Sequence, residues 1–237
     1  MYRDAERKSA MGNEVTTGNM LDQALRDRPA IWTRLRSTEA WPIGRAAAIN
    51  VGFSAFYGFV MGAYQLTAHD GWKQVMSSAV KVPCLFLLTL VICLPALYVV
   101  SALLGSSLTL RQLTGILMAS LLVTTTLLAA FAPITAFFML SARQYAFIKL
   151  LNVIFFGIAA GAGLAVVASA VKTVGNQELA GYRTLLRFWF VVYAFVGTQM
   201  AWILRPFVGY PKLGFALFRN LEGNFYTDVL KSLAKLF

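Results

Sequence analysis

The chain has 237 residues, of which 58% are hydrophobic and only 13% are charged, against about 25% charged residues in an average soluble protein. Its formal net charge is +11. This composition excludes a soluble globular domain, because too few polar side chains remain to cover one. Two cysteines and one histidine make no metal-ligand pattern, so neither a metal nor a cofactor is expected.

The first forty residues divide into two parts. Residues 1–18 are polar and of mixed charge, which predicts a disordered arm. Residues 19–40 predict an amphipathic helix in the membrane interface, with docking to a partner protein as the alternative. Its apolar side chains recur at helical spacing at Leu21, Leu25, Trp32 and Leu35. Pro29 is expected to kink this helix or to divide it in two.

Five stretches without Asp, Glu, Lys or Arg follow, at residues 46–69, 82–110, 112–142, 150–171 and 188–204. A bilayer core about 30 Å thick needs about 20 apolar helical residues to cross it, and each stretch is near or above that length. The prediction is an all-α, polytopic transmembrane helix bundle over residues 41–208. Its spans are expected at about 44–68, 82–105, 110–141, 145–171 and 186–207.

Two shorter segments complete the expected topology. Residues 73–81 are expected to form a shallow interfacial turn before the second span. Residues 209–237 predict an amphipathic tail, in which Val229, Leu230 and Leu233 share one face of a short helix. The bundle therefore carries interfacial amphipathic helices at both ends.

Small residues mark two expected helix-packing faces. They recur at four-residue spacing in the first span, at Ser54, Gly58 and Gly62, and in the fourth span, at Gly157 and Gly161. Such spacing lets a second helix approach closely. Packing within the chain is favoured over contact between two copies.

The five charge-free stretches leave no Asp, Glu, Lys or Arg in the middle of any expected span. Such a residue near the bilayer centre costs at least about 2.5–3.5 kcal/mol and is kept mainly for function, so its absence argues against proton-coupled transport and against an enzyme. The uncharged polar candidates are Thr124, Asn152, Thr198 and Gln199. Interhelical hydrogen bonding is the favoured role of these side chains, and lining a pore is the alternative.

Basic residues at the span boundaries are expected to reach lipid head groups, which makes a bilayer with anionic lipids the predicted partner. These residues are Lys81, Arg143, Lys149, Arg187 and Arg205. Basic residues before the first span favour a cytoplasmic N-terminus. No dense basic run supports a nucleic-acid partner.

Two stretches resemble a group of uncharacterised bacterial five-span proteins whose organisation is similar to that of Yip1-like membrane proteins. The first is residues 131–138, and the second runs from 193 through 207 to 222–226; the resemblance covers about residues 20–237. It implies an inner-membrane protein that organises membranes through protein contacts, with no catalytic residues to transfer. Some members carry a label of actin-binding WH2 protein. Residues 35–38 match the Leu-Lys-Lys-Thr motif only loosely, so no actin-like partner is expected.

The sequence thus predicts a non-enzymatic integral membrane protein that acts as a subunit or scaffold of a homo- or hetero-oligomeric assembly. The alternative is a small oligomeric ion channel or solute pore, lined by uncharged polar residues of the third to fifth spans.

Overall fold

The computed structural model describes residues 17–36, 41–66, 71–103, 108–142, 144–174, 182–209, 216–218 and 223–234. These residues form helices and their connections, which confirms the all-α class. In chain order the helices are α2 (Thr17–Leu25), α3 (Arg28–Arg36), α4 (Ile43–Gly62), the 3-10 helix η1 (Ala63–Gln65), α5 (Gly71–Leu103), α6 (Leu110–Ser141), α7 (Tyr145–Val174), α8 (Tyr182–Ile203) and α9 (Phe225–Ala234). Apart from its last two positions, the predicted disordered arm lies outside the described residues.

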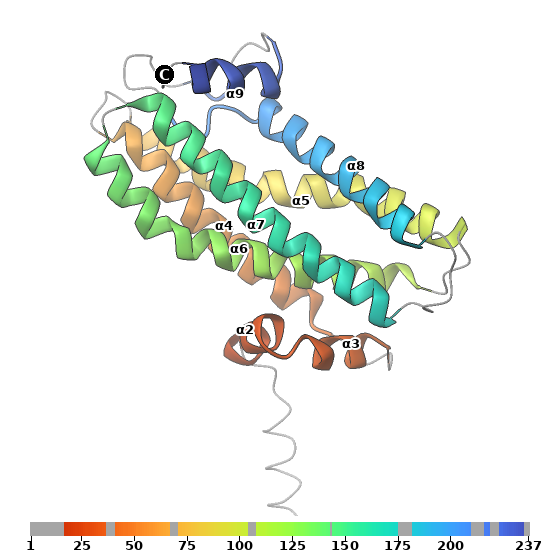
Figure 1. Cartoon of the computed structure of the whole chain (residues 1–237). Coiled ribbons are helices and arrows are strands. Elements are labelled where there is room, and N and C mark those ends of the chain that lie inside the picture. Colours follow the sequence, from red (N-terminus) through yellow and green to blue (C-terminus); the bar gives the residue numbers. More distant parts are fainter. Residues whose placement is uncertain are drawn as a thin grey trace, which may run out of the picture.

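Five of the described helices, α4 to α8, are long and apolar enough to cross a membrane. They form one elongated bundle in which consecutive spans run in opposite directions (Figure 1). Helices α2 and α3 lie across one side of this bundle, and α9 lies at the opposite end (Figure 1). The chain is therefore an integral membrane helix bundle of five spans, as predicted.

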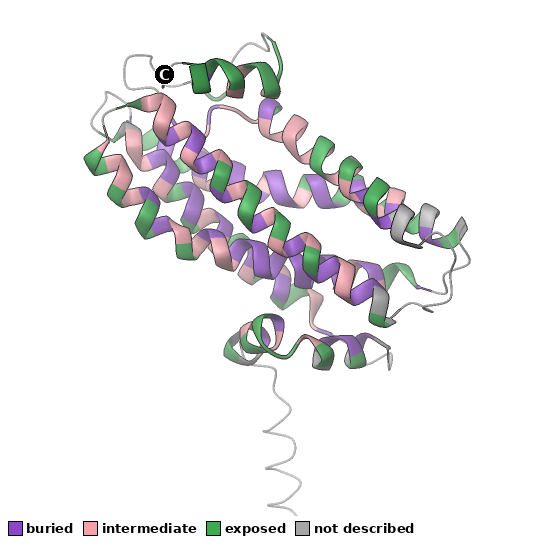
Figure 2. Cartoon of the chain, viewed as in Figure 1, coloured by how far each residue is buried: buried purple, intermediate pink, exposed green. Residues whose placement is uncertain are grey.

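The spans do not pack in chain order. Side by side they follow the series α7, α6, α4, α5 and α8, and the two end helices of this series make little contact with each other. Helix α6 is the most enclosed of the five spans. Of the residues in its apolar 18-residue stretch, 72% are buried, whereas only 17% are buried in the corresponding stretch of α8. Figure 2 shows that the burial of α6 is concentrated in its N-terminal half, where most of residues 113–125 are buried. The bundle is an open ring that does not close between α7 and α8.

Helix α4 joins its neighbours through three buried polar side chains, Asn50, Ser54 and Tyr57. The Asn50 amide nitrogen donates to the Met118 carbonyl oxygen at 3.3 Å, and its amide oxygen accepts from the Thr125 hydroxyl at 3.0 Å. Two turns further, the Tyr57 hydroxyl donates to the Asn152 amide oxygen. In membranes such interhelical contacts stabilise the bundle by about 0.6 kcal/mol each on average.

The small residues of α4 bring it close to α5. A Cβ atom added at Gly58 would lie 2.4 Å from the Ser78 carbonyl oxygen, and one at Gly62 would lie 2.6 Å from the Val75 Cα atom. Both distances are shorter than a van der Waals contact, so only glycine fits at these two positions. Ser54 is buried on the same helix and donates to the Asn50 carbonyl oxygen. The seam of the first span therefore packs within the chain.

Helix α6 begins where the sequence places it, because a capping box defines its start. The Thr109 hydroxyl accepts from the Gln112 backbone N–H, while the Gln112 side-chain oxygen accepts from the Thr109 backbone N–H. This reciprocal pair satisfies two backbone donors that would otherwise lack partners. The Gln112 amide nitrogen also donates to the Leu35 carbonyl oxygen at 3.1 Å, which joins α6 to α3.

The segment predicted over 19–40 forms two helices divided just before Pro29, which is one of the two outcomes expected for this proline. Most of their large apolar side chains are buried in the protein, although Leu25 is 42% exposed. Met20, Ile31 and Trp32 are at most 3% exposed, because α2 and α3 pack on α6, α4 and α7. The expectation of an interfacial or partner-docking helix is therefore corrected: this apolar face is part of the protein core.

The second span also differs from its prediction. Helix α5 begins at Gly71 and continues through Lys81, so the shallow interfacial turn expected at residues 73–81 does not form. Its first turns carry Gln74, Ser78 and Lys81 on the side that faces the end of α8. A polar run that looked like a loop in the sequence is helical because its polar side chains have partners in the fold.

Candidate functional site

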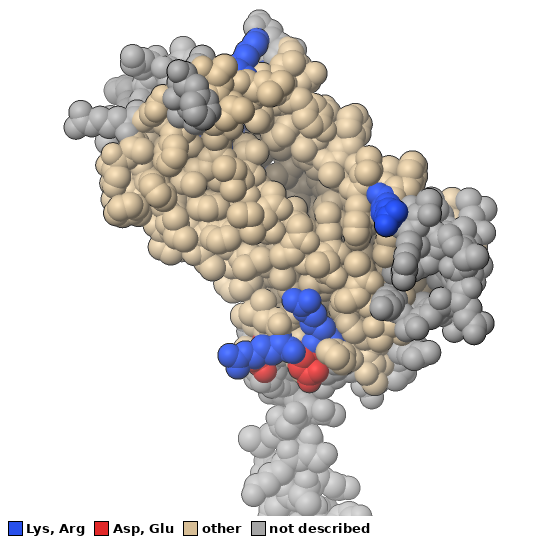
Figure 3. Space-filling model, in the orientation of Figure 1, with Lys and Arg blue, Asp and Glu red and all other residues tan. Residues whose placement is uncertain are grey.

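A cavity of about 600 Å³ lies where the ring of spans stays open. Helices α7 and α8 form its two long walls, α5 and α6 form its floor, and α9 borders one end. Figure 3 shows the corresponding hollow in a broad face made mostly of uncharged residues. A volume of this size is in the range of small-molecule binding sites.

Close packing elsewhere keeps α7 and α8 apart. Helix α7 lies on α6 at Gly163, where an added Cβ atom would be 2.2 Å from the Thr124 hydroxyl oxygen, and the Ser120 hydroxyl donates to the Gly163 carbonyl oxygen at 2.7 Å. Helix α8 lies on α5, where the Trp189 indole N–H donates to the Cys93 carbonyl oxygen. Each wall is therefore fixed to the floor, not to the other wall.

Gly157 and Gly161 do not pack against another described helix. An added Cβ atom at either position meets no described atom within 4 Å, and both residues line the cavity. The helix-packing role expected for them is therefore not found within this chain. Gly163, two residues further on, is the glycine of α7 that packs. The reason is rotational: Gly163 faces α6, whereas the other two glycines face the gap in the ring.

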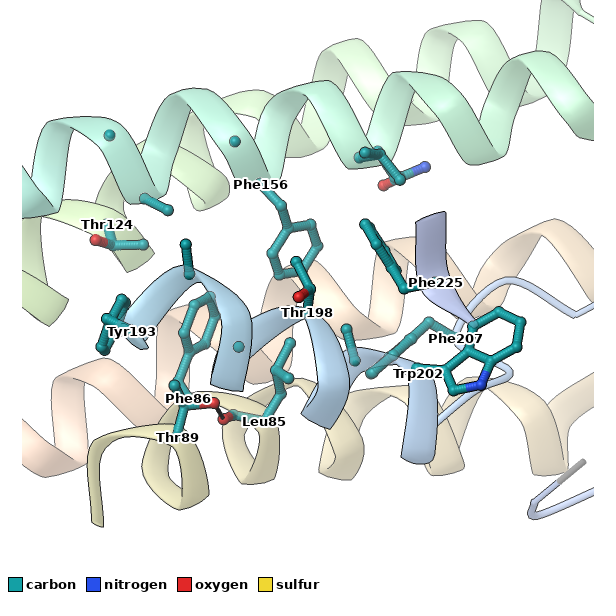
Figure 4. A pocket seen from close by; sticks show the side chains of 18 of the residues that line it. Leu85, Phe86, Thr89, Thr124, Phe156, Tyr193, Thr198, Trp202, Phe207 and Phe225 are labelled. Carbon is teal, nitrogen blue, oxygen red and sulfur yellow. Dashed lines mark hydrogen bonds between the residues drawn. The ribbon is translucent and has the colours of Figure 1, made fainter. Parts of the chain in front are cut away.

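Three of the four uncharged polar candidates border this cavity: Thr124 from α6, Asn152 from α7 and Thr198 from α8. Figure 4 shows Thr124 and Thr198 at separate points along the space, with Phe156 between the walls. Gln199, also on α8, is half-buried and is not among the lining residues. The fold thus brings three of these residues, from three different helices, to one cavity.

The three polar candidates at the cavity already have hydrogen-bond partners. The Asn152 amide oxygen accepts from Tyr57 at 2.7 Å, and its amide nitrogen donates to the Ile148 carbonyl oxygen at 2.8 Å. The Thr124 hydroxyl donates to the Ser120 carbonyl oxygen, and the Thr198 hydroxyl donates to the Phe195 carbonyl oxygen. These hydrogen bonds leave a mainly apolar space that suits a hydrocarbon group better than a hydrated ion.

The charged residues among the described lining gather at the end of the cavity next to α9. Lys149 of α7 forms an ion pair with Asp228 of α9, and both side chains are at most one-third exposed. The Arg205 guanidinium stacks on the Trp202 ring, 3.4 Å from its centroid. Lys149, Arg205 and Asp228 together carry one net positive charge. The cavity therefore has one charged end and one apolar end.

A polar clasp holds the chain where it turns after α8, and we define it as Gln74, Ser78, Lys81 and Tyr145. The Gln74 amide donates to the Pro206 carbonyl oxygen at 3.0 Å, and the Ser78 hydroxyl donates to the Phe207 carbonyl oxygen at 2.5 Å. The Tyr145 hydroxyl donates to the Val208 carbonyl oxygen at 3.1 Å. Irregular backbone at membrane depth needs such internal partners.

Lys81 completes the clasp and departs most from its prediction. It is 5% exposed, and its ammonium group donates to the carbonyl oxygens of Pro206 and Leu217, with the Phe218 ring 5.1 Å away. The expected contact with lipid head groups is therefore wrong for this residue. A lysine whose three N–H donors meet backbone carbonyls and an aromatic face stays inside the protein.

The other boundary cations have different surroundings. Lys149 pairs with α9, and Arg205 stacks on Trp202 at the cavity. Arg187 is exposed near the start of α8, a position that fits its expected role at the membrane surface. Arg143 lies outside the described residues.

Sequence reasoning missed the residues that hold the site together. Tyr57, Gln74, Ser78 and Tyr145 make its long-range hydrogen bonds, yet tyrosine and serine are ordinary in membrane helices. One signal was present: Gln74, Ser78 and Lys81 recur at helical spacing, as one polar face of a helix does.

Comparison with family models, with curated proteins and with solved structures gives no match. The fold and the cavity geometry are therefore the basis for the functional argument.

Proposed function

We propose that the protein is a non-enzymatic subunit or scaffold of a membrane assembly, formed with further copies of itself or with other membrane proteins. The observation that supports this is a second small-residue face on α4, directed away from the bundle. Gly44, Ala48 and Gly52 recur at four-residue spacing and are exposed. A Cβ atom added at either glycine meets no described atom within 4 Å.

This outer face has the same spacing as the inner seam of α4, which contacts α5. In a bilayer the hydrophobic effect does not drive helices together, because lipid tails are as apolar as the helix surface. Close backbone packing at small residues is therefore a main source of helix association. A Yip1-like role in membrane organisation, which the sequence resemblance implies, belongs to the same class of function. A cytoplasmic N-terminus in a bacterial inner membrane is part of this proposal.

Cross-linking in the native membrane tests the assembly. In a background with Cys84 and Cys93 replaced by alanine, Ala48→Cys is expected to give a disulfide-linked dimer, or a cross-link to a second protein. Val80→Cys, at an exposed position on α5, is the matched control and is expected to stay monomeric. Gly52→Leu should weaken the assembly in detergent, and Ala130→Leu, an exposed position on α6, should not. A strict monomer in both membrane and detergent would contradict the proposal.

An oligomeric channel or solute pore is the second candidate, favoured by the meeting of Thr124, Asn152 and Thr198 at one cavity. Conductance across planar bilayers that changes with Asn152→Leu or Thr198→Leu would support it. Gln199→Leu is the matched control within α8, since Gln199 does not line the cavity. Absence of conductance under all ionic conditions would remove this candidate.

A further inference from the structure

The cavity between α7 and α8 is long and narrow. Its lining residues extend along α7 from Tyr145 to Val167, which corresponds to about 33 Å at a rise of 1.5 Å per residue. A volume of about 600 Å³ over that length gives a mean cross-section of about 18 Å². A space this long and slender suits one extended hydrocarbon chain.

The two ends of the cavity differ in chemistry. Lys149, Arg205 and Asp228 stand at the end next to α9, and the buried Lys81 ammonium lies behind the Pro206 carbonyl oxygen that it binds. These four groups carry two net positive charges. The far end is bordered by Leu164 and Val167 of α7 and by Trp189 of α8. An occupant that matches both ends has an anionic or strongly polar head and an apolar tail.

The small residues of the walls favour a flexible apolar chain. Gly157 and Gly161 of α7 and Gly197 of α8 expose backbone to the space, and aromatic rings separate them. Figure 4 shows Phe156, Tyr193 and Phe225 projecting from three helices around the gap. Alternating gaps and rings suit a hydrocarbon chain, which bends around obstacles, better than a rigid ligand.

From the length, the cross-section and the charge at one end, we propose that this cavity binds one acyl chain of an anionic phospholipid from the bilayer. The phosphate group lies at the Lys149–Arg205 end beneath α9, and the second acyl chain stays in the membrane. Basic pockets between spans bind anionic head groups in this way. This inference is independent of the proposed assembly, which concerns the outer face of α4.

Native mass spectrometry of the full chain tests the proposal. The protein in mild detergent is titrated with palmitoyl-oleoyl phosphatidylglycerol and, separately, with phosphatidylcholine of the same chains. One tightly bound phosphatidylglycerol per chain is expected, with weaker binding of phosphatidylcholine. Equal retention of the two lipids, or retention of neither, would overturn the proposal.

Variants then locate the lipid. An added Cβ atom at Gly161 meets no described atom within 4 Å, so Gly161→Phe is expected to fill part of the cavity and abolish retention while the helix content is kept. Ala130→Phe, the matched control at an exposed position on α6 that does not line the cavity, should retain the lipid. Retention by Gly161→Phe equal to that of Ala130→Phe would place the lipid elsewhere.

The head-group position is tested separately. Arg205→Gln is expected to reduce the preference for phosphatidylglycerol about fivefold, since one basic residue near anionic head groups contributes about 1 kcal/mol. Arg187→Gln, the matched control at the other end of α8, should leave the preference unchanged. A photoreactive group at the end of the acyl chain is expected to label residues near Trp189, and labelling confined to α9 would overturn the assigned direction.

Discussion

The described helices nearest the two termini, α2 and α3 on one side and α9 on the other, are all short, yet they contact the bundle in opposite ways. Helices α2 and α3 turn their apolar residues inward, so that Ile31 is 1% exposed and Trp32 is 3% exposed. Helix α9 turns Asp228 and Ser232 toward the bundle, together with the half-buried Phe225 and Val229. Its Leu230 is 63% exposed.

The difference shows that an amphipathic pattern does not by itself identify what covers the apolar face. A helix whose apolar side chains are buried in protein cannot also insert them into lipid. Helices α2 and α3 therefore extend the core, whereas α9 is the helix whose exposed leucines are available to the membrane interface. Figure 2 shows the outer side of α9 exposed along most of its length.

The largest expected effect is on the apolar contact of α3. Trp32→Ala removes a buried aromatic side chain, which typically costs about 3–5 kcal/mol. We expect α2 and α3 to detach from the bundle, with loss of hydrogen-exchange protection over residues 17–36. Leu25→Ala is the control, because Leu25 is 42% exposed, and its effect should stay below about 0.5 kcal/mol. Unchanged protection in Trp32→Ala would show that apolar burial does not hold these helices.

The polar clasp that holds the chain before α9 comes next. Lys81→Met removes the donor to the Leu217 carbonyl oxygen, and a buried acceptor left without a partner costs about 1–3 kcal/mol. We expect a lower thermal midpoint in detergent and faster amide exchange at residues 207–209. Lys73→Met, at an exposed position on the same helix, should change neither measurement. Equal behaviour of the two variants would contradict a structural role for the buried lysine.

The ion pair between α7 and α9 should contribute less. Asp228→Asn is expected to weaken the docking of α9 by about 0.2–1 kcal/mol, because the pair is partly exposed to solvent. High salt should produce a similar loss in the unmodified protein, since screening shortens the Debye length to about 3 Å at 1 M. Hydrogen exchange over residues 225–234 measures both effects.

Hydrogen exchange measured at increasing salt concentration should separate α2 and α3 from α9 most clearly. Protection of α2 and α3 should not fall with salt, because apolar contacts are not screened. Asp22→Asn removes the exposed ion pair with Arg26 and should leave the hydrogen-exchange protection of α9 unchanged. A parallel loss of protection in α2, α3 and α9 would mean that the two ends are held by the same kind of contact.

The smallest effect on stability is expected on the outer face of α9. Leu230→Ser should change the free energy of unfolding in detergent by less than about 0.5 kcal/mol, as for other exposed positions. In a bilayer it should move α9 toward water, which a spin label at Thr227→Cys reports as depth, with Cys84 and Cys93 replaced by alanine. Ala234→Ser serves as the control. Destabilisation comparable to that of Trp32→Ala would show that Leu230 faces protein.

Several elements could be predicted because the membrane constrains them strongly. The span α6 begins at Leu110 and ends at Ser141, as expected, since its capping box and the flanking Arg111 and Arg143 are visible in the sequence. The start of α5 was not predictable, because Gln74 and Lys81 look like interfacial residues until their carbonyl partners, 125–136 residues away, are known.

The candidate site was accessible only in part. Thr124, Asn152 and Thr198 stand out in an apolar sequence as polar groups that need partners, so they could be selected without a structure. That they border one cavity, and that Gln199 does not, depends on the rotation of three helices about their axes. Gly157 and Gly163 illustrate the same point. Both lie on α7, yet Gly157 faces the gap in the ring and Gly163 faces α6.

The amino-acid sequence alone determined that this chain is a five-span helical membrane protein, because a bilayer admits only long apolar helices with few charged residues. Tertiary packing decided the rest. The order of helices around the ring, the opening between α7 and α8, and the opposite placement of α2–α3 and α9 depend on contacts between residues far apart in the chain. Local composition carries no record of which face meets which neighbour, since lipid and protein interiors are equally apolar.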